Sequence, residues 1–239
     1  LMVASRYDMF ILEDDGRVDE QIFNEYTSLS LRYPPRFTQV SSSKEALAEL
    51  KQNHYELVIC MPNMDNSDTF ELAKRMKIHD PRIPIVLLTP FSKSVTAALR
   101  KEDLSGIDYV FSWLGNADLL LAIIKLIEDR MNVEHDVKTV GVQTIMLVED
   151  SVRFYSSALP LLYKLVLSES KEFSKEALND HLRMLRMRGR PKILLARDYE
   201  EALSYYKKYG DDMLGIVCDM SFKRDGKQDP LAGKRLGEW

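Results

Sequence analysis

Two stretches of the chain, "KEALAELKQNHYELVICM" (44–61) and "EEALSYYKKYGDDMLGIVCDM" (200–220), follow one pattern. Each predicts an amphipathic helix, a polar turn and an apolar strand that contains a cysteine. With Cys60 aligned to Cys218, the second stretch is longer by about two residues. An internal repeat of this kind indicates two similar domains in one chain.

The two copies differ at the end of this strand, where Met61 in the first copy stands opposite Asp219 in the second. Upstream, "FILEDD" (10–15) aligns with "MLVEDS" (146–151) as the first strand of each copy. On this alignment the second copy carries roughly 20 extra residues between its first and second strands. A structureless insertion of that size is uncommon in a compact domain, so we expect a helical insertion at about 152–190.

The first copy alternates between apolar runs of strand length and amphipathic segments of helix length. The predicted strands are 8–12, 36–40, 55–61, 83–89 and 109–113. The predicted helices are 19–31, 42–53, 67–78, 92–102 and a last helix that Asn116 caps. Strands separated by helices form parallel crossovers, and apolar strands of this kind are buried on both faces. The fold class is therefore α/β, a flavodoxin-like doubly wound parallel sheet in each copy.

The second copy has the same alternation but fewer elements. Its predicted strands lie at 144–148, 192–196 and 214–219, with a helix at about 199–209 between the last two. About 70 residues complete the first copy after Met61, whereas 20 follow Asp219. We therefore expect the second sheet to be incomplete after its third strand, and the chain to be part of a longer polypeptide. The predicted organisation is a first domain at 1–131, a stiff linker at 132–143 and a second domain at 144–239.

Composition excludes several classes of protein. The 239 residues are 45% hydrophobic and 29% charged, as in ordinary soluble domains. No apolar run reaches the roughly 18 residues of a membrane span. The net charge of −4 gives no support for a nucleic-acid or membrane surface. Two cysteines inside predicted strands suggest no disulfide framework and fit the reducing cytoplasm.

Three carboxylates of the second copy are expected at one edge of its sheet. Glu149 and Asp150 follow the first strand and Asp219 follows the third. Ligands of doubly wound sheets bind at the carboxyl ends of the strands, and the first and third strands are neighbours there. Three negative charges so placed repel one another unless a cation such as Mg²⁺ intervenes. An aspartate beside Mg²⁺ can attack phosphorus, because the metal offsets charge repulsion.

This set of residues resembles the receiver domain of two-component response regulators. The strand-one acidic pair of that family matches Glu149 and Asp150, and its phosphoacceptor matches Asp219. The resemblance implies a Mg²⁺ site formed by Glu149, Asp150, Asp219 and Ser221. It also implies a histidine kinase or another phosphate donor as partner, in a phosphorelay-type signalling role.

The first copy resembles a receiver that has lost its site. Glu13 and Asp14 match the acidic pair and Thr89 matches the family's hydroxyl position. Met61, however, replaces the acceptor and Ser112 replaces the lysine. A thioether is a poor ligand for a hard cation. We therefore expect the first copy neither to bind Mg²⁺ nor to accept phosphate.

A second resemblance covers "VEDS" (149–151 with the valine before them), "RPKILLA" (190–196) and "CDMSFKRDGKQDPLAG" (218–233). These motifs are similar to the N-terminal region of bacterial proteins that continue into a catalytic part like phosphoenolpyruvate synthase or pyruvate phosphate dikinase. The resemblance implies a non-enzymatic regulatory segment, with the catalytic domains as partners in the same polypeptide. A homodimer is left open.

Two other functions stay open. Both copies could be inactive and serve as a protein–protein interaction or dimerisation scaffold. Alternatively, Asp219 could be the nucleophile of a Mg²⁺-dependent phosphatase of the haloacid dehalogenase type. That family has a second aspartate two residues after the nucleophile, where this chain has Ser221, which weighs against it.

Overall fold

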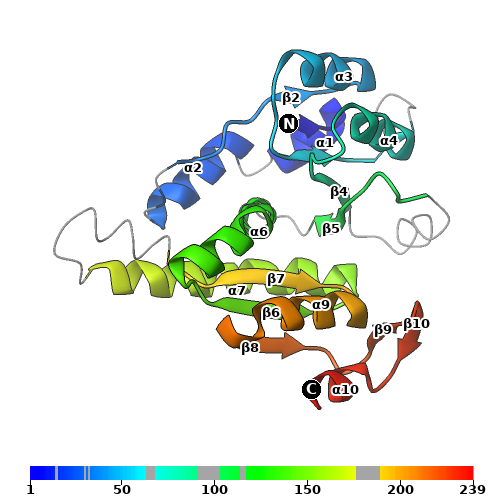
Figure 1. The fold of residues 1–239 in the computed structure, drawn as a ribbon. Coiled ribbons are helices and arrows are strands. Elements are labelled where there is room, and N and C mark those ends of the chain that lie inside the picture. The colour runs from blue at the N-terminus through cyan, green and yellow to red at the C-terminus, as the bar shows by residue number, and fades with distance from the viewer. Residues whose placement is uncertain are drawn as a thin grey trace. The chain divides into compact units, whose positions relative to one another are not determined.

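The chain divides into two compact units in a computed structural model (Figure 1). The structure describes residues 1–13, 16–29, 31, 33–62, 68–90, 103–113, 117–175 and 189–238. Unit 1 comprises residues 1–28 and 32–120, and unit 2 comprises 29–31 and 121–239. The division at 120 lies within a helix, eleven residues before the end of the first domain as drawn from the sequence.

Unit 1 contains a parallel sheet with the strand order β2-β1-β3-β4-β5, counted over the described residues. Its strands are β1 (Met2–Val3), β2 (Gln39–Val40), β3 (Val58–Cys60), β4 (Ile85–Pro90) and β5 (Tyr109–Trp113). This is the strand order of flavodoxin-like doubly wound folds. The predicted fold class is therefore confirmed.

Helices and both faces of this sheet form the core of unit 1. The helices are α1 (Arg6–Leu12), α2 (Val18–Ser28), α3 (Ser43–Gln52) and α4 (Thr69–His79). One face packs Val3, Cys60 and Leu87 against Leu50 of α3 and Met76 of α4. Residues pointing to the other face are buried as well, namely Met2, Ile59, Val86 and Leu88. A parallel sheet covered on both faces explains the continuous apolar runs of its strands.

The predicted first strand at 8–12 is wrong, because these residues lie in helix α1. The side chain of Ser5 caps this helix by accepting a hydrogen bond from the backbone of Asp8. Tyr7 and Phe10 are exposed and Leu12 is buried, so the apolar residues do not alternate as in a strand. The first strand is the short β1, which precedes the helix. The predicted helix at 92–102 and the cap at Asn116 lie outside the described residues.

Unit 2 has a three-stranded parallel sheet, in the order β7-β6-β8, within the part of the chain that the structure describes. Its strands are β6 (Thr144–Val148), β7 (Lys192–Ala196) and β8 (Met213–Cys218). Helix α9 (Tyr199–Tyr209) and helix α10 (Ala232–Gly237) pack on one face together with Phe222. Phe222 belongs to an antiparallel hairpin of β9 (Phe222–Arg224) and β10 (Lys227–Asp229).

Backbone hydrogen bonds align the two sheets residue by residue. The amide of Met61 donates to the carbonyl of Val3 at 2.9 Å, and the amide of Asp219 donates to the carbonyl of Val148 at 3.0 Å. Met61 and Asp219 are therefore equivalent, as predicted. Ala4 is the equivalent of Glu149 in unit 1. The amide of Glu149 donates to the carbonyl of Ala196 at the end of β7, and the amide of Ala4 donates to the carbonyl of Val40 at the end of β2.

This alignment also corrects the predicted insertion. Val3 pairs with Val40 and Val148 pairs with Ala196, which are separations of 37 and 48 positions, so the excess is 11 rather than about 20. Helix α7 (Val152–Lys175) occupies most of this connection, so these residues are helical. The rest of the predicted insertion, 176–188, lies outside the described residues.

Helix α6 (Asp118–His135) continues through a π-helical turn (Asp136–Val140), so the predicted linker at 132–143 is helical up to residue 140. Gly141 ends this turn with a φ of 72°, a left-handed conformation that favours glycine. None of the helices in the described part is long and apolar enough to span a membrane.

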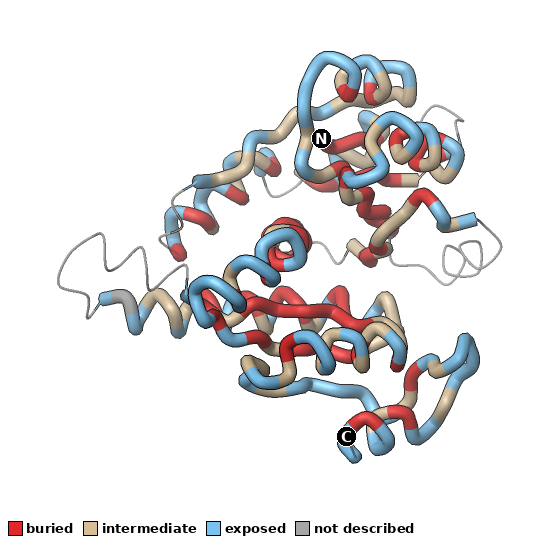
Figure 2. Tube along the Cα trace, viewed as in Figure 1, coloured by how far each residue is buried: buried red, intermediate tan, exposed pale blue. Residues whose placement is uncertain are grey.

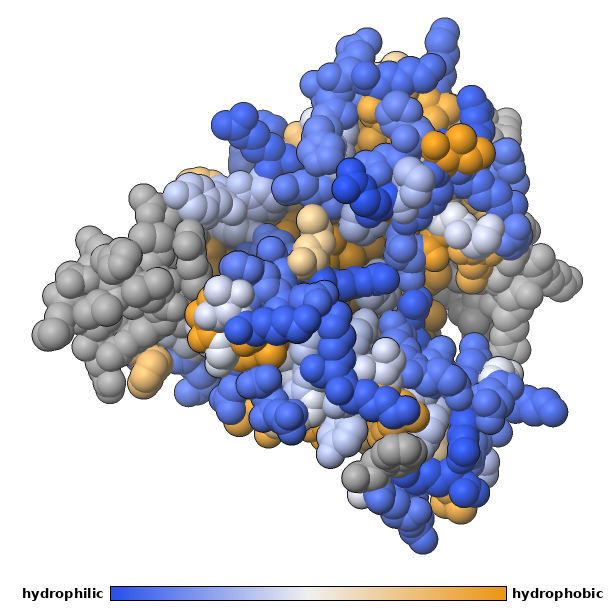
Figure 3. Space-filling view, viewed as in Figure 1, coloured by the Kyte–Doolittle hydropathy of each residue, from blue (hydrophilic) through white to orange (hydrophobic). Residues whose placement is uncertain are grey.

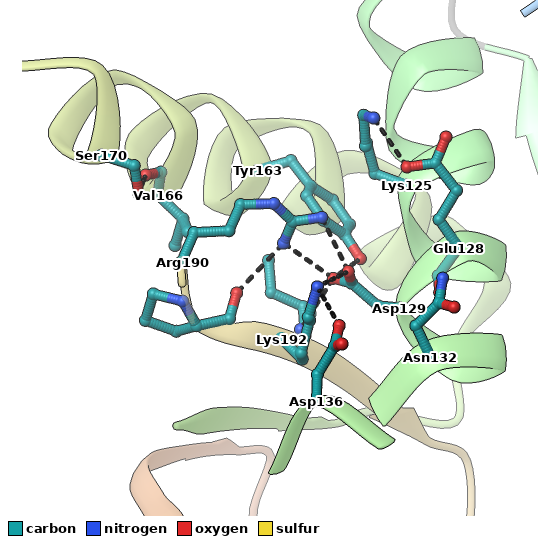
Figure 4. A network of polar contacts seen from close by, with 12 residues as sticks. Lys125, Glu128, Asp129, Asn132, Asp136, Tyr163, Val166, Ser170, Arg190 and Lys192 are labelled. Atoms are coloured by element: carbon teal, nitrogen blue, oxygen red, sulfur yellow. Dashed lines mark hydrogen bonds and ion pairs between the residues drawn. The ribbon is translucent and has the colours of Figure 1, made fainter. Parts of the chain in front are cut away.

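A buried polar cluster attaches α6 to the rest of unit 2 (Figure 4). The carboxylate of Asp129 accepts two hydrogen bonds from Arg190, at 2.7 and 3.0 Å, and one from the hydroxyl of Tyr163 on α7 at 2.9 Å. It also accepts the backbone amide of Ile193 at 3.0 Å. Since β7 is an edge strand, Asp129 satisfies an edge amide that would otherwise need water. Lys192 joins the cluster through Asp136 at 2.8 Å.

Candidate acidic site of the second unit

The carboxyl edge of the unit 2 sheet places Glu149 and Asp219 on neighbouring strands. β6 and β8 are paired with Val148 opposite Cys218, and the two acidic residues directly follow these partners. Asp150 comes next along the chain. Asp219 is exposed, whereas Glu149 and Asp150 are partly buried. Glu149 and Asp219 therefore follow neighbouring strands at the same edge of the sheet.

Local backbone groups hold both side chains. One oxygen of Glu149 accepts the amide of Ser151 at 2.9 Å, and one oxygen of Asp219 accepts the amide of Met220 at 2.7 Å. Both bonds are turn-type contacts between a carboxylate and the backbone just after it. They fix the carboxylates close to the ends of their strands.

The carboxylates influence one another through their charge. Partial burial raises the pKa of Glu149, the Ser151 amide opposes this rise, and the charges of Asp219 and Asp150 add to it. Partial burial also raises the pKa of the Cys218 thiol to about 11, with further contributions from the charges of Asp219 and Glu149. The site is thus an accumulation of negative charge beside a neutral thiol, and it would favour a cation.

The fit of this site to Mg²⁺ is partial. Carboxylate and carbonyl oxygens are the donors that Mg²⁺ prefers. Among the described residues, however, no group of three or more histidine, cysteine, aspartate or glutamate side chains is close enough to hold a metal ion. The carbonyl and hydroxyl of Ser221 both contact the side-chain amide of Gln228, at 2.9 and 3.2 Å. The predicted ligands are therefore of the right type, but they form no closed coordination sphere.

The backbone around Asp219 is packed tightly against helix α10. The amide of Gly233 donates to the carbonyl of Met220 at 3.0 Å, and a Cβ atom at Gly233 would collide with the carbonyl oxygen of Asp219. Sequence reasoning missed this contact. The preceding hairpin could have been recognised from Asp225 and Gly226, a two-residue turn in which both residues have positive φ.

The hairpin is attached to α9, in addition to the contact of Gln228 with Ser221. The guanidinium of Arg224 lies over the ring of Tyr199, 4.8 Å from its centroid. The amide of Asp225 donates to Glu200 at 3.1 Å. This longer connection after Asp219 is therefore an ordered part of unit 2 with partners of its own.

At the corresponding edge of unit 1, the described residues that align with Glu149 and Asp150 are not acidic. Ala4 and Ser5 occupy the positions of Glu149 and Asp150. Glu13, expected at a strand end, instead lies at the C-terminal cap of α1, where it accepts a hydrogen bond from Gln39 at 3.3 Å. That expectation failed because it depended on the wrong first strand. Asp14 lies outside the described residues.

The side chains at the other predicted positions of this edge, Met61, Thr89 and Ser112, are buried. Met61 is 3% exposed, and the hydroxyl of Thr69 contacts its carbonyl at 3.5 Å. The Thr89 hydroxyl donates to the carbonyl of Phe111 at 3.3 Å, and Ser112 is buried as well. The buried thioether of Met61 thus stands where unit 2 has the exposed carboxylate of Asp219. The hydroxyl of Thr89 is used in a hydrogen bond between β4 and β5.

Two curated proteins resemble part of this chain. Both are the transcriptional regulatory protein ZraR, from Salmonella typhimurium and from Salmonella typhi. Each is 33% identical over 69 residues, which is 29% of this chain and 15% of the relative. No family model and no solved structure matches. The chain therefore spans a small part of these relatives, and its similarity to a response regulator supports a receiver-type signalling role in coarse terms.

Proposed function

We propose that unit 2 is a receiver-type signalling module whose phosphoacceptor is Asp219. The observation that carries this proposal is the position of Glu149 and Asp219 on neighbouring strands at the carboxyl edge of a doubly wound sheet. The equivalent positions in unit 1 have lost both acids. Phosphate on Asp219 would lie on an exposed surface, where a partner can recognise it.

The chemistry assigned to Asp219 is transfer of a phosphoryl group. A carboxylate oxygen of Asp219 attacks the phosphorus of a phosphohistidine or of an acyl phosphate. The bond from phosphorus to the donor nitrogen or oxygen breaks, and its electron pair leaves with the donor. Glu149 and Asp150 would hold Mg²⁺, which when bound would offset the charge of the incoming phosphoryl group. Ser221 would add its carbonyl oxygen.

Unit 1 has no place in this transfer. Met61 provides no nucleophile, and its side chain is buried. We assign to unit 1 a structural or docking role in the same regulatory segment. Catalytic domains elsewhere in the same polypeptide, and a histidine kinase as donor, belong to this proposal.

Phosphorylation by a small acyl phosphate tests the proposal. The full-length polypeptide, of which this chain is expected to be a part, is incubated with acetyl phosphate and Mg²⁺ and analysed by intact-protein mass spectrometry. We expect the mass of one phosphate on the wild type and none on Asp219→Asn. Asp225→Asn, which changes an exposed aspartate of the hairpin in the same unit, is the matched control and should be phosphorylated. Absence of phosphate on the wild type, or its persistence on Asp219→Asn, would overturn the assignment.

A second candidate function is an interaction scaffold with both units unphosphorylated. The lack of a closed metal-binding group among the described residues favours it, together with exposed apolar side chains on β8 such as Leu214 and Val217. A scaffold would show no phosphate and no dependence on Mg²⁺. Turnover of a phosphate ester, in contrast, would indicate the phosphatase alternative.

A further inference from the structure

Helix α7 is apolar on two of its faces. Its inward face contributes Tyr155, Leu159, Tyr163 and Leu167 to the core of unit 2, and Figure 4 shows Tyr163 pointing from this helix toward Asp129. On the opposite side, Phe154, Leu161 and Leu165 are 58%, 70% and 59% exposed. The surface in Figure 3 is mostly hydrophilic, so exposed leucines on one helix face need an explanation.

The exposed residues have the spacing of a helix-pairing seam. With Ala158 between them, they follow one another by four, three and four positions, which places them in one stripe along the helix. Ser168 and Glu172, the next positions of the stripe, are polar and end it. The small Ala158 would let a partner helix approach closely. This stripe, Phe154, Ala158, Leu161 and Leu165, is called the α7 seam below.

The charges beside the α7 seam decide which arrangement is favourable. One flank carries Arg153, Lys164 and Lys171, and the other carries Glu169. An antiparallel pair about a two-fold axis brings each flank against itself, so the basic flank would repel its copy. A parallel pair brings opposite flanks together. Lys164 of one helix then lies beside Glu169 of the other, five positions further on, which is the ion pair typical of parallel coiled coils.

We propose that the α7 seam is a homodimer interface, in which α7 pairs in parallel with α7 of a second copy of this chain. The apolar stripe supplies the contact and the pair of Lys164 and Glu169 sets its direction. The proposal is independent of phosphate on Asp219, since none of its residues belongs to the acidic edge. A dimer of this kind would hold two acidic edges in one assembly.

Sedimentation equilibrium with a charge swap tests the partner and the direction together. Lys164→Glu or Glu169→Lys alone should weaken the dimer about tenfold, because each change creates two like-charge contacts. The double variant Lys164→Glu/Glu169→Lys should restore the wild-type affinity. Leu161→Asp should leave a monomer with unchanged circular dichroism. A wild-type chain that is monomeric, or a double variant that is no tighter than the single variants, would overturn the proposal.

Cysteine cross-linking distinguishes parallel pairing from the alternatives. Cys218 is exposed and is first changed to serine, while Cys60 is buried and stays. In a parallel pair each seam residue faces its own copy, so Ala158→Cys and Leu165→Cys should both form intermolecular disulfides. Ser204→Cys, exposed on α9, is the control and should not. An antiparallel dimer, or a seam covered by another part of the chain, would leave at least one seam variant uncrosslinked and would refute the assignment.

Discussion

Replacing Asp129 by alanine should destabilise unit 2 more than any surface change. This side chain is fully buried and accepts bonds from Arg190, Tyr163 and the amide of Ile193. Its removal leaves a guanidinium that is 7% exposed without its anion. Burial alone would lower the pKa of Arg190, yet the charge and hydrogen bonds of Asp129 raise it, so Arg190 stays charged. Its charge cannot be removed by titration when the partner is lost.

The expected loss of unfolding free energy in each variant follows from the interactions that the variant removes. Asp129→Ala breaks a buried ion pair and should cost about 3–5 kcal/mol of unfolding free energy. Tyr163→Phe removes one hydrogen bond to a charged group and should cost about 1.5–3 kcal/mol. The double change Asp129→Leu/Arg190→Met removes both charges and should cost less than the sum of the single losses.

Urea unfolding followed by circular dichroism measures these differences, and hydrogen exchange locates them. Exchange should rise in β7 and α6 of Asp129→Ala and stay unchanged in β3 and β4, which belong to unit 1. Asp211→Ala, at an exposed position before β8, is the control and should shift stability by less than about 0.5 kcal/mol. If Asp129→Ala behaves like this control, the buried cluster does not hold α6 as described.

Three further outcomes are expected. The pKa of Glu149 is higher in the folded than in the unfolded protein. Its contribution to the free energy of unfolding is therefore favourable below the pKa of the unfolded state and is lost as pH rises through the pKa of the folded state. Glu149→Gln should therefore raise the melting temperature at pH 7, with the gain vanishing near pH 4; a loss at pH 7 would contradict this. Met61→Asp should cost about 3 kcal/mol or more, since it buries a carboxylate, and calorimetry of unit 1 would show it. Gly233→Ala should cost about 1–3 kcal/mol in urea unfolding, because its Cβ strikes the Asp219 carbonyl; an unchanged midpoint would argue against tight packing there.

The sequence predicts best those elements whose ends carry their own signals. Strand β7 has the predicted bounds because a proline precedes its continuous apolar run. Helix α3 begins after the predicted cap at Ser42, which accepts the amide of Glu45 while Glu45 accepts that of Ser41. Asp198 caps α9 in the same way in the second copy. These are local interactions, so neighbouring residues suffice to predict them.

Long-range packing decided the features that the sequence analysis missed. Residues 8–12 are apolar enough for a strand, and the pairing of Met2 and Val3 with β2 and β3 determines the first strand instead. When β1 is taken as the first strand, Ala4 and Ser5 of the first copy align with Glu149 and Asp150 of the second. The role of Asp129 was missed because its partners Tyr163 and Arg190 are 34 and 61 positions away. No local pattern reveals a contact over that distance.

Strand β8 is mostly exposed (Figure 2). The strand was recognised from its apolar run, and the equivalence of Asp219 with Met61 was predicted correctly from the repeat. The attachment of the β9–β10 hairpin to α9 was not, because Arg224 and Tyr199 are joined only by the fold.

Mg²⁺ binding measured by calorimetry tests the central claim most directly. We expect one Mg²⁺ per chain, a higher melting temperature in its presence, and the loss of both effects in Asp219→Asn. At a free Mg²⁺ concentration of ten times the dissociation constant, Mg²⁺ should raise the unfolding free energy of unit 2 by about 1.4 kcal/mol. Ser5→Ala, at the equivalent edge of unit 1, should bind as the wild type does. Binding that is absent from the wild type, or unchanged in Asp219→Asn, would contradict the assignment of a cation-dependent site to this acidic edge.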